Sequence, residues 1–219
     1  MPEDANNPQK VSLESAYVAQ GNALLKRKDY QGAIVHYQKA LEADPQDMAA
    51  YHGWGHALHT LKDYQGAIEQ YKKIIEMDPQ DPHIYNHWGN ALYALKDYAG
   101  AVEQYKKAIE ADPQYTWAYW GWGDTLRDLK DYEGASEQYK KMIEIDPQDT
   151  IAYHKWGDAL YALKDYDGAL EKYKQTIEIS PGYPELYCCC GRALAALGRD
   201  AEAQEMYTKA ETIRQFYRE

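Results

Sequence analysis

A period of 34 residues runs through almost the whole chain and limits its fold more than any other feature. Five prolines stand 34 residues apart, at Pro45, Pro79, Pro113, Pro147 and Pro181. The stretch from Tyr51 to Pro79 returns nearly unchanged three times. A fixed period of this length is typical of stacked repeat proteins, which grow by adding units rather than by enlarging one core. The sequence therefore predicts an all-α solenoid.

Each repeat is expected to contain two helices. Tyr51, Trp54 and Leu58 recur at three- and four-residue steps, which is the spacing of one helix face. The segment 62–64 breaks this pattern, and Asp63 can cap a second helix. The aspartate before each proline ends that helix, because a residue before proline is pushed out of helical geometry.

The period divides the chain into six units. The predicted repeats are 14–47, 48–81, 82–115, 116–149, 150–183 and 184–217. Residues 1–13 are expected to be a flexible lead-in, and residues 218–219 form the end. The last unit has Phe216 in place of the closing proline, so its second helix is expected to run on from about Asp200 towards Arg218.

The repeated residues resemble a known family. The pattern Tyr51-x2-Trp54-Gly55-x2-Leu58, Ala67-x3-Tyr71 and Pro79 is similar to the tetratricopeptide repeat, in six copies. The resemblance implies a right-handed superhelix whose inner wall is built from the first helices. Gly55 is expected to let the partner helix approach, and Trp54, Trp88, Trp122 and Trp156 are expected to be core. One departure from the family pattern, the glycine that precedes the repeated alanine of the second helix (Gly66), has no explanation in the sequence.

Composition narrows the classes of partner and compartment. The net charge of −11 disfavours nonspecific binding to nucleic acid or anionic membranes. No apolar run is long enough to span a bilayer, and the polar start MPEDANNPQK lacks the apolar core of a signal peptide. The three cysteines are adjacent, at 188–190, which suits a reducing compartment. We therefore expect a cytoplasmic protein without membrane insertion.

The first helices carry the residues that differ between repeats, and these are the candidate binding residues. They are predicted to line a concave groove that binds a peptide or helix of a partner protein. The candidates are His52, His56, His59, His83, Asn86, His87, Asn90, Tyr93, Trp117, Trp120, Asp124, Arg127, Asp128, His154, Lys155, Asp158, Tyr161 and Arg192.

Aromatic and charged candidates indicate the chemistry of the partner. Trp117 and Trp120, with Tyr93 and Tyr161, are expected to form an aromatic anchor, although one tryptophan can instead pack against the next repeat. Acidic residues interleaved with basic ones, as at Asp124 and Arg127, suit a ligand with apolar and basic side chains. For each single charge, a solvated polar wall is an equally good interpretation.

The histidines leave three interpretations open. They can serve polar recognition, or change binding between about pH 5 and 8, or bind a metal ion. Three histidines on one helix cannot reach one ion, because seven residues span roughly 10 Å. A metal site would need pairs at four-residue spacing, and the candidates are His52, His56, His83 and His87.

The main prediction is a noncatalytic scaffold without a cofactor. The sequence contains no Ser/His/Asp context, no Gly-rich phosphate loop and no segment outside the repeats large enough for a further domain. Self-assembly through the similar surfaces of the repeat ends is the alternative, because stacked units can continue into another copy.

Overall fold

The computed structural model describes residues 8–217 and the side chains of residues 15–217. Over this range it contains twelve α-helices and no strand. The helices are α1 (Pro8–Lys26), α2 (Tyr30–Ala43), α3 (Met48–Thr60), α4 (Tyr64–Met77), α5 (Pro82–Ala94), α6 (Tyr98–Ala111), α7 (Thr116–Asp128), α8 (Tyr132–Ile145), α9 (Thr150–Ala162), α10 (Tyr166–Ile179), α11 (Pro184–Ala196) and α12 (Asp200–Phe216). The predicted all-α repeat of helix pairs is confirmed.

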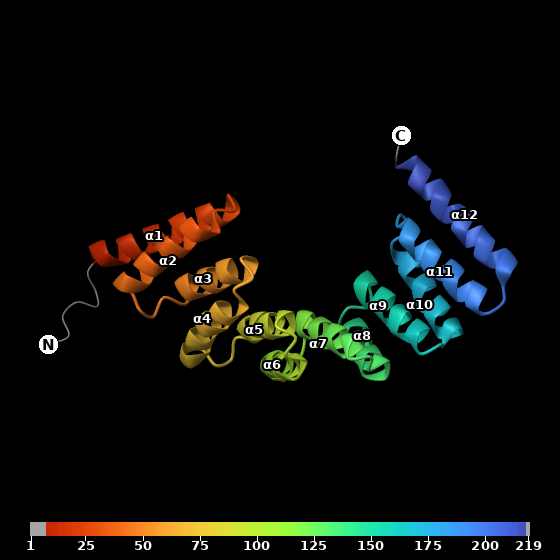
Figure 1. Cartoon of the computed structure of the whole chain (residues 1–219), viewed down its shortest axis with the longest axis horizontal. Helices are drawn as coiled ribbons and strands as arrows, with labels where there is room; N and C mark the ends of the chain where they lie inside the picture. Colours follow the sequence, from red (N-terminus) through yellow and green to blue (C-terminus); the bar gives the residue numbers. More distant parts are fainter. Residues whose placement is uncertain (1–7, 218–219) are drawn as a thin grey trace. The chain divides into compact units, whose positions relative to one another are not determined.

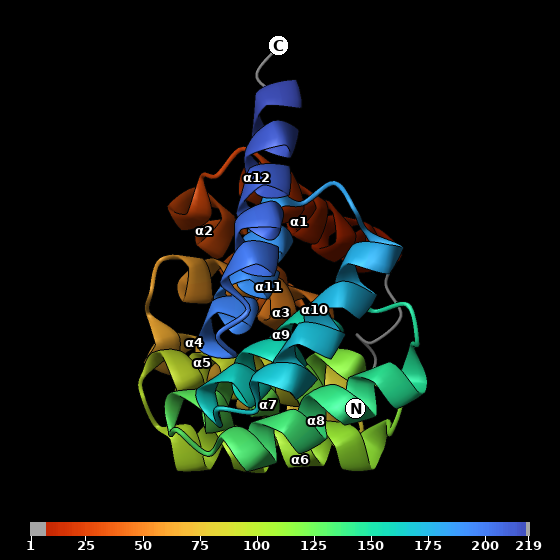
Figure 2. The same ribbon diagram turned by 90° about the vertical axis from the view of Figure 1, so that its right-hand side faces the viewer.

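The helices belong to two units, residues 1–113 (unit 1) and 114–219 (unit 2), with three helix pairs in each. Within every pair, the second helix packs back along the first, as α12 does along α11 in Figure 1 and Figure 2. Each pair also packs against the next pair of its own unit. The right-handed superhelix predicted for residues 14–217 involves both units together and stays a prediction.

The start of the first repeat differs from the expected lead-in. Helix α1 begins at Pro8, so residues 8–13 are helical, whereas residues 1–7 of the expected lead-in lie outside the described residues. The physical reason is that proline is tolerated in the first turn of a helix and no further proline interrupts the segment up to Lys26.

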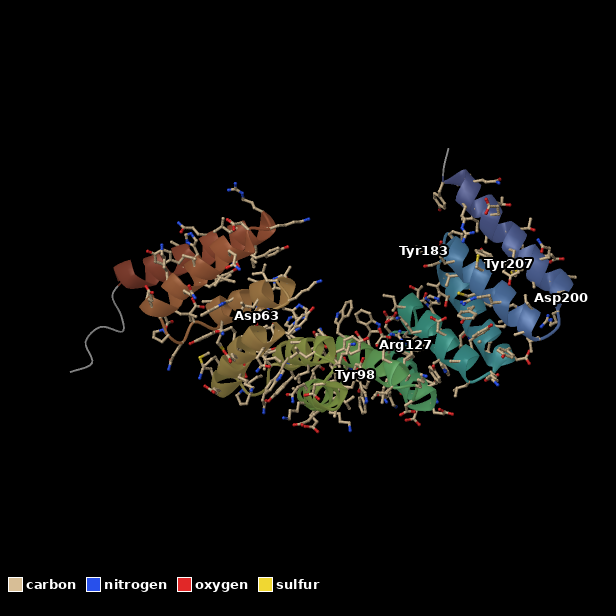
Figure 3. The ribbon with its side chains drawn as sticks, in the orientation of Figure 1. Asp63, Tyr98, Arg127, Tyr183, Asp200 and Tyr207 are labelled. Atoms are coloured by element: carbon tan, nitrogen blue, oxygen red, sulfur yellow. The ribbon has the colours of Figure 1, made fainter. Side chains whose placement is uncertain are left out.

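An aspartate caps the second helix of the first five repeats, as predicted at Asp63 (labelled in Figure 3). The backbone N–H of Gly66 donates to Asp63 Oδ1 at 3.0 Å. A Cβ on Gly66 would lie 2.6 Å from the other carboxylate oxygen. The glycine that the sequence left unexplained therefore makes room for the cap. The same pair recurs at Asp29/Gly32, Asp97/Gly100, Asp131/Gly134 and Asp165/Gly168.

The turn between the two helices uses a left-handed residue. Lys62 has φ 66°, and its N–H donates to His59 O while the N–H of Asp63 donates to Leu58 O. Lysines take this place in the first five repeats, and Gly198 takes it in the sixth with φ 74°. Because left-handed geometry crowds a Cβ, this turn carries a steric cost at every lysine.

Tyrosine, rather than tryptophan, fills the core of each repeat. Tyr37, Tyr71, Tyr105, Tyr139 and Tyr173 are the largest side chains that are fully buried. Each ring lies against a glycine of the preceding helix, so that a Cβ on Gly123 would stand 2.6 Å from Tyr139 Cε1. The last repeat has the same contact between Gly191 and Tyr207, the second of which is labelled in Figure 3. The expected role of these glycines in close helix approach is confirmed.

The four repeated tryptophans are less buried than predicted. Trp54, Trp88, Trp122 and Trp156 are all half-buried. Lys72 Nζ lies 5.3 Å from the ring centroid of Trp88, and Lys172 Nζ lies 4.4 Å from that of Trp156. One side of these indole rings therefore contacts a lysine from a second helix, α4 for Trp88 and α10 for Trp156, and the ring also packs against a buried cluster.

The last repeat ends as the sequence predicts. Its second helix, α12, runs from Asp200 to Phe216 and is longer than the corresponding helices of the other repeats, which stop before proline. Within the part of the chain that the structure describes, no helix combines the length and the apolar character needed to span a bilayer.

Candidate functional site

The candidate residues lie on the first helices of the repeats and fall in both units. Those in unit 1 are on α3 and α5, and those in unit 2 are on α7, α9 and α11. In each unit, some candidate residues face solvent and others already contact a partner inside the protein.

The two tryptophans of α7 have different environments. Trp120 packs against the buried cluster that contains Tyr139, Met142 and Ala152, and Ala152 belongs to the next repeat. Trp117 is 54% exposed, and its ring stands edge-on to that of Trp120, with 5.4 Å between the centroids. Of the two interpretations left open by the sequence, Trp120 therefore takes the packing role and Trp117 the surface role.

A small cavity opens beside the exposed tryptophan. It measures about 100 Å³ and is lined by Thr116, Trp117, Trp120, Met142, Asp149 and Ile151. Ile151 on α9 is 48% exposed, so the rim of the cavity is apolar on both sides. A hollow between two exposed apolar side chains can receive one apolar side chain of another molecule.

The charged candidate residues towards the end of α7 are paired with one another and with Lys155 of α9. Arg127 Nη1 donates to Asp124 Oδ1 at 2.8 Å, and Arg127 Nη2 donates to Asp128 Oδ1 at 3.0 Å. Lys155 Nζ lies 3.3 Å from Asp124 Oδ1 and bridges α9 to α7. These four side chains form an ion-pair network within unit 2. This pairing weakens the expectation that Asp124 and Asp128 are free to bind a basic ligand.

Three candidate residues accept a hydrogen bond from a buried tyrosine hydroxyl. Tyr105 donates to Asn90 Oδ1 at 2.8 Å, and Tyr139 donates to Asp124 Oδ1 at 2.7 Å. Tyr173 donates to Asp158 Oδ1 at 2.9 Å. Tyr37 makes the same bond to Asn22. The position was predicted for partner recognition, but in these four repeats it also satisfies the core tyrosine.

Histidines gather on α3 and α5 in unit 1. The rings of His52 and His87 lie 5.3 Å apart, and His87 stacks against the buried ring of Tyr71 at 5.8 Å. Burial, followed by repulsion from His52 and the other neighbouring histidines, lowers the pKa of His87 to about 4. His87 is therefore neutral at physiological pH.

The other unit 1 candidates differ in accessibility. His52, His56 and His83 are exposed, whereas Asn86 is buried, so the prediction that Asn86 faces an open groove is wrong for this structure. Asparagine at this place is short enough to be covered, unlike the tryptophan or histidine of other repeats. Within the described residues, the histidines predicted as metal ligands do not bring three ligand atoms together.

Aromatic candidates near the helix ends pack inside their own repeats. His59 lies edge-on to Tyr64 at 5.1 Å, and Tyr93 lies 5.7 Å from Tyr98. In unit 2, Tyr161 lies 5.2 Å from Tyr166 and also carries the guanidinium of Arg192, 5.5 Å from its ring. These rings cover the turn at the base of the second helix.

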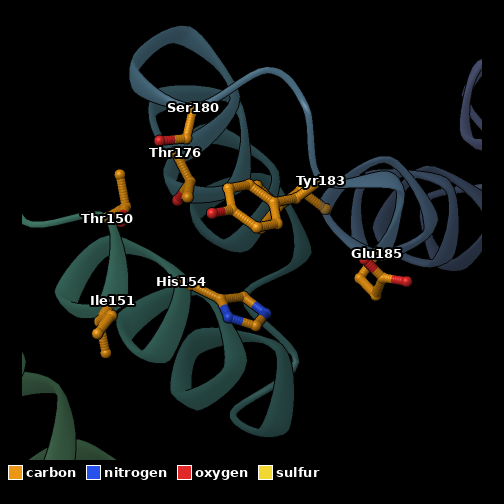
Figure 4. Close-up of a pocket in the computed structure, with 8 residues that line it drawn as sticks. Thr150, Ile151, His154, Thr176, Ser180, Tyr183 and Glu185 are labelled. Carbon is orange, nitrogen blue, oxygen red and sulfur yellow. The ribbon is translucent and has the colours of Figure 1, made fainter. Parts of the chain in front are cut away.

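A larger cavity lies between α9, α10 and α11. It measures about 380 Å³ and is lined by Thr150, Ile151, His154, Thr176, Ser180, Tyr183, Glu185 and Leu186. In the view of Figure 4, the Tyr183 ring lies between Thr176 and Glu185, with His154 beneath it. This places the candidate His154 at an accessible wall.

The repeat register places Cys189 and Ile151 at groove-facing positions, but neither is among the binding candidates chosen from the sequence. Cys189 is buried next to His154, at 3.8 Å between Sγ and Nε2. Cys189 follows His154 by 35 residues, which is close to one period, and this spacing could have indicated that the two side chains are neighbours. Ile151 occupies the same repeat position as Trp117, which would have marked it as the second rim residue.

Comparison with family models identifies the repeats. A TPR repeat model matches residues 89–126, 123–163 and 157–198, and a tetratricopeptide repeat model matches residues 18–82. The resemblance drawn from the sequence is confirmed. No curated protein matches the chain by sequence.

Solved structures with the same fold include several repeat proteins. MamA is 26% identical over 74% of this chain and 95% of its own, with a TM-score of 0.69. YrrB, described as a TPR protein with an unusual peptide-binding site, is 24% identical over 82% of this chain and 92% of its own, with a TM-score of 0.67. PilF of Pseudomonas aeruginosa is 21% identical over 90% of each chain, with a TM-score of 0.74.

Proposed function

We propose that this chain, which belongs to the tetratricopeptide repeat family, is a scaffold that binds a segment of a partner protein on the first helices of unit 2. The family supports a role in protein interaction. The peptide site described for YrrB belongs to that protein, and it illustrates that a fold of this kind can carry one. The location and chemistry of the site in this chain rest on its own residues.

The exposed indole of Trp117 is the observation that carries the proposal. Trp117 is 54% exposed, although burying an aromatic side chain is favourable. Its orientation is fixed by Trp120, which is itself anchored in the core. A rigid exposed aromatic beside a small cavity loses little conformational entropy when a partner covers it, and such residues dominate the energy of many interfaces.

The surroundings favour an apolar side chain as the central contact. Ile151 and Trp117 form the apolar rim, and the acidic group in the lining, Asp149, accepts hydrogen bonds from the backbone N–H groups of Ile151 and Ala152. A partner that inserts an aliphatic or aromatic side chain would displace water without separating an ion pair. At Asp124, a basic partner residue would have to compete with Arg127 and Lys155. We therefore propose a peptide or helix with an apolar anchor.

Affinity capture with matched variants tests this proposal. The full chain is used to capture partners from its native cells, and the recovered partner's affinity is then measured by calorimetry. Trp117→Ala should weaken binding by at least about tenfold, since truncation of an interface anchor costs about 2 kcal/mol or more. Val35→Ala is the control, because Val35 is also an exposed apolar residue but lies on α2 in unit 1.

The outcome separates recognition from instability. Trp117→Ala changes an exposed side chain and should leave helicity and thermal stability intact, whereas Trp120→Ala would disturb the core. Equal affinities for Trp117→Ala and the unsubstituted chain would overturn the proposal. Equal losses for Trp117→Ala and Val35→Ala would do the same, because the loss would not be specific to this surface.

Self-association is the second candidate. The end of α12 exposes two aromatic rings, Phe216 (76%) and Tyr217 (69%), which lie edge to face at 5.5 Å. A second copy of the chain could cover them. Light scattering over a concentration series should then show a rise in mass that Phe216→Ser abolishes. A constant monomer mass at all concentrations removes this candidate.

A further inference from the structure

Three side chains with metal-ligand chemistry meet on two helices of unit 2. His154 and Asp158 lie one turn apart on α9, and Cys189 faces them from α11. His154 Nε2 is 3.8 Å from Cys189 Sγ and 3.8 Å from Asp158 Oδ2. The three ligand atoms all lie within 4.8 Å of one another.

These distances are near those of a shared metal ion. Tetrahedral Zn²⁺ binds sulfur at about 2.3 Å and nitrogen or oxygen at about 2.0–2.2 Å, so that its ligand atoms stand about 3.3–3.7 Å apart. Movements of a few tenths of an ångström to about 1 Å in side chains would therefore complete the set. Imidazole, carboxylate and thiolate are all accepted ligands of Zn²⁺, and the thiolate disfavours Mg²⁺ and Ca²⁺.

The geometry distinguishes a ligand set from a catalytic relay. In a nucleophile–histidine–carboxylate relay, the imidazole uses one nitrogen for the nucleophile and the other for the carboxylate. Here the same nitrogen, Nε2 of His154, faces both Cys189 and Asp158. Three groups that point at one place are arranged for a common centre rather than for proton transfer along a line.

Two neighbouring residues orient the ligands. The hydroxyl of Tyr173 donates to Asp158 Oδ1 at 2.9 Å, which leaves Oδ2, the oxygen nearer His154, as the ligand atom. Burial raises the pKa of the Cys189 thiol, and the hydrogen bond that Arg192 Nη2 donates to Cys189 Sγ at 3.1 Å opposes this by favouring the thiolate. The guanidinium also repels a cation, so we expect an affinity below that of sites made of four thiolates.

The register of the repeat gives an independent comparison. Three periods earlier, unit 1 carries His52, His56 and His87 at the places of His154, Asp158 and Cys189. The rings of His52 and His87 are neighbours, but within the described residues only the unit 2 set brings three ligand atoms within 4.8 Å. One and two periods before the unit 2 set, at least one of the three equivalent positions holds glycine, lysine or tryptophan, so neither of these repeats offers three metal ligands.

We propose that His154, Asp158 and Cys189 bind one Zn²⁺ ion in unit 2. Three protein ligands leave a fourth position for water or for a group of a bound partner. Cys189 binds as the thiolate, so its S–H proton passes to the buffer when the S–Zn bond forms, and affinity rises with pH. The site goes beyond the proposed scaffold function, because Zn²⁺ binding does not depend on a partner.

The test uses the full chain without an affinity tag, in a buffer that keeps thiols reduced without binding zinc. Titration with ZnCl₂ by calorimetry should give a unit 2 site of micromolar affinity or tighter. Titration with CoCl₂ should give a thiolate-to-cobalt charge-transfer band in the near ultraviolet. Because this band requires a thiolate ligand, it distinguishes metal bound at Cys189 from metal bound by the three histidines of unit 1, which have no sulfur.

Variants assign the site. Cys189→Ser should abolish the charge-transfer band, and His154→Gln should weaken Zn²⁺ binding by at least about tenfold. Cys188→Ser, which changes the neighbouring thiol near Arg214, and His52→Gln should leave the band unchanged. Circular dichroism of each variant checks that the helices remain. His154 is only half-buried, so its variant tests the site even if Cys189→Ser loses stability.

Three results would overturn the proposal. These are the absence of any thiolate band at millimolar CoCl₂, a band that persists in Cys189→Ser, and Zn²⁺ affinity that is unchanged in a folded His154→Gln variant. The second result would place the metal on Cys188 or Cys190. Retention of the band with His154→Gln at unchanged Zn²⁺ affinity would reduce the set to a cysteine with an adventitious ion.

Discussion

Replacing Tyr139 with phenylalanine removes one hydroxyl group and leaves the shape of the buried ring unchanged. In the folded chain this hydroxyl donates to Asp124 at 2.7 Å, and the side chain is completely buried. Tyr71 is a matched control, because it is equally buried and packs on the equivalent glycine. Its repeat has His56 at the position where four other repeats carry the acceptor. Among the described residues, the Tyr71 hydroxyl has no hydrogen bond equivalent to the one between Tyr139 and Asp124.

The structure gives a graded expectation. A hydrogen bond to a charged acceptor contributes about 1.5–3 kcal/mol, and one to a neutral acceptor about 0.5–1.5 kcal/mol. Tyr139→Phe should therefore lower the free energy of unfolding by about 1.5–3 kcal/mol. Tyr105→Phe, whose acceptor is the neutral Asn90, should cost about 1 kcal/mol. Tyr71→Phe should stay within about 0.5 kcal/mol of the original chain.

Urea unfolding followed by far-ultraviolet circular dichroism measures these differences. For a chain of this size, the loss at Tyr139 corresponds to a fall in Tm of about 3–12 °C. Because Tyr105 and Tyr71 both lie in unit 1, their comparison holds even if the two units unfold separately. Equal costs for Tyr71→Phe and Tyr139→Phe would refute the reasoning, since the acceptor would then contribute nothing.

Three further substitutions test other parts of the structure. Gly157→Ala should lower Tm, because its Cβ would lie 2.6 Å from Tyr173 Cε1 and overpacking costs about 1–3 kcal/mol. The pKa of His87 is about 4 in the folded chain and 6.5 ordinarily. Its contribution to the free energy of unfolding is therefore fully present above pH 6.5, and up to about 3 kcal/mol is lost as the pH falls towards 4. Urea titrations across that range should show a smaller fall in His87→Gln. Lys62→Gly should raise the free energy of unfolding by up to about 1 kcal/mol, measured as a higher urea midpoint, because φ 66° strains lysine and Gly198 already takes this place in the last repeat.

Each of these expectations can fail in a defined way. A higher Tm for Gly157→Ala would mean that the helix adjusts to the added methyl group and gains its helix propensity. Identical acid sensitivity in His87→Gln would assign the acid limb to other groups. A lower midpoint for Lys62→Gly would mean that the entropy of the unfolded glycine outweighs the relief of strain.

Much of the fold could be predicted because its determinants are local and repeat. The proline period, the cap at Asp63 and the longer final helix follow from short-range backbone rules, and the structure confirms each of them. The lead-in at 1–13 was less predictable. Polarity suggested flexibility, yet α1 begins at Pro8, because a polar segment without helix breakers can extend a helix that is packed further along.

The candidate site could be predicted only in outline. The sequence placed the variable residues on the first helices, but it could not assign the packing role to Trp120 and the surface role to Trp117. That choice depends on the contact of Trp120 with Ala152 in the next repeat. It also treated Asp124 as open to a ligand, whereas Tyr139, Arg127 and Lys155 occupy its oxygens.

The sequence by itself determined the repeat, the helix pairs, their caps and the family, because each depends on residues within one period. The tertiary structure decided which variable side chains remain accessible and which converge. Cys189 reaches His154 because stacking places α11 against α9, and Gly66 is explained by the carboxylate of Asp63 that it admits. Such outcomes depend on side-chain conformations and on packing between neighbouring helices, which a 34-residue period does not specify.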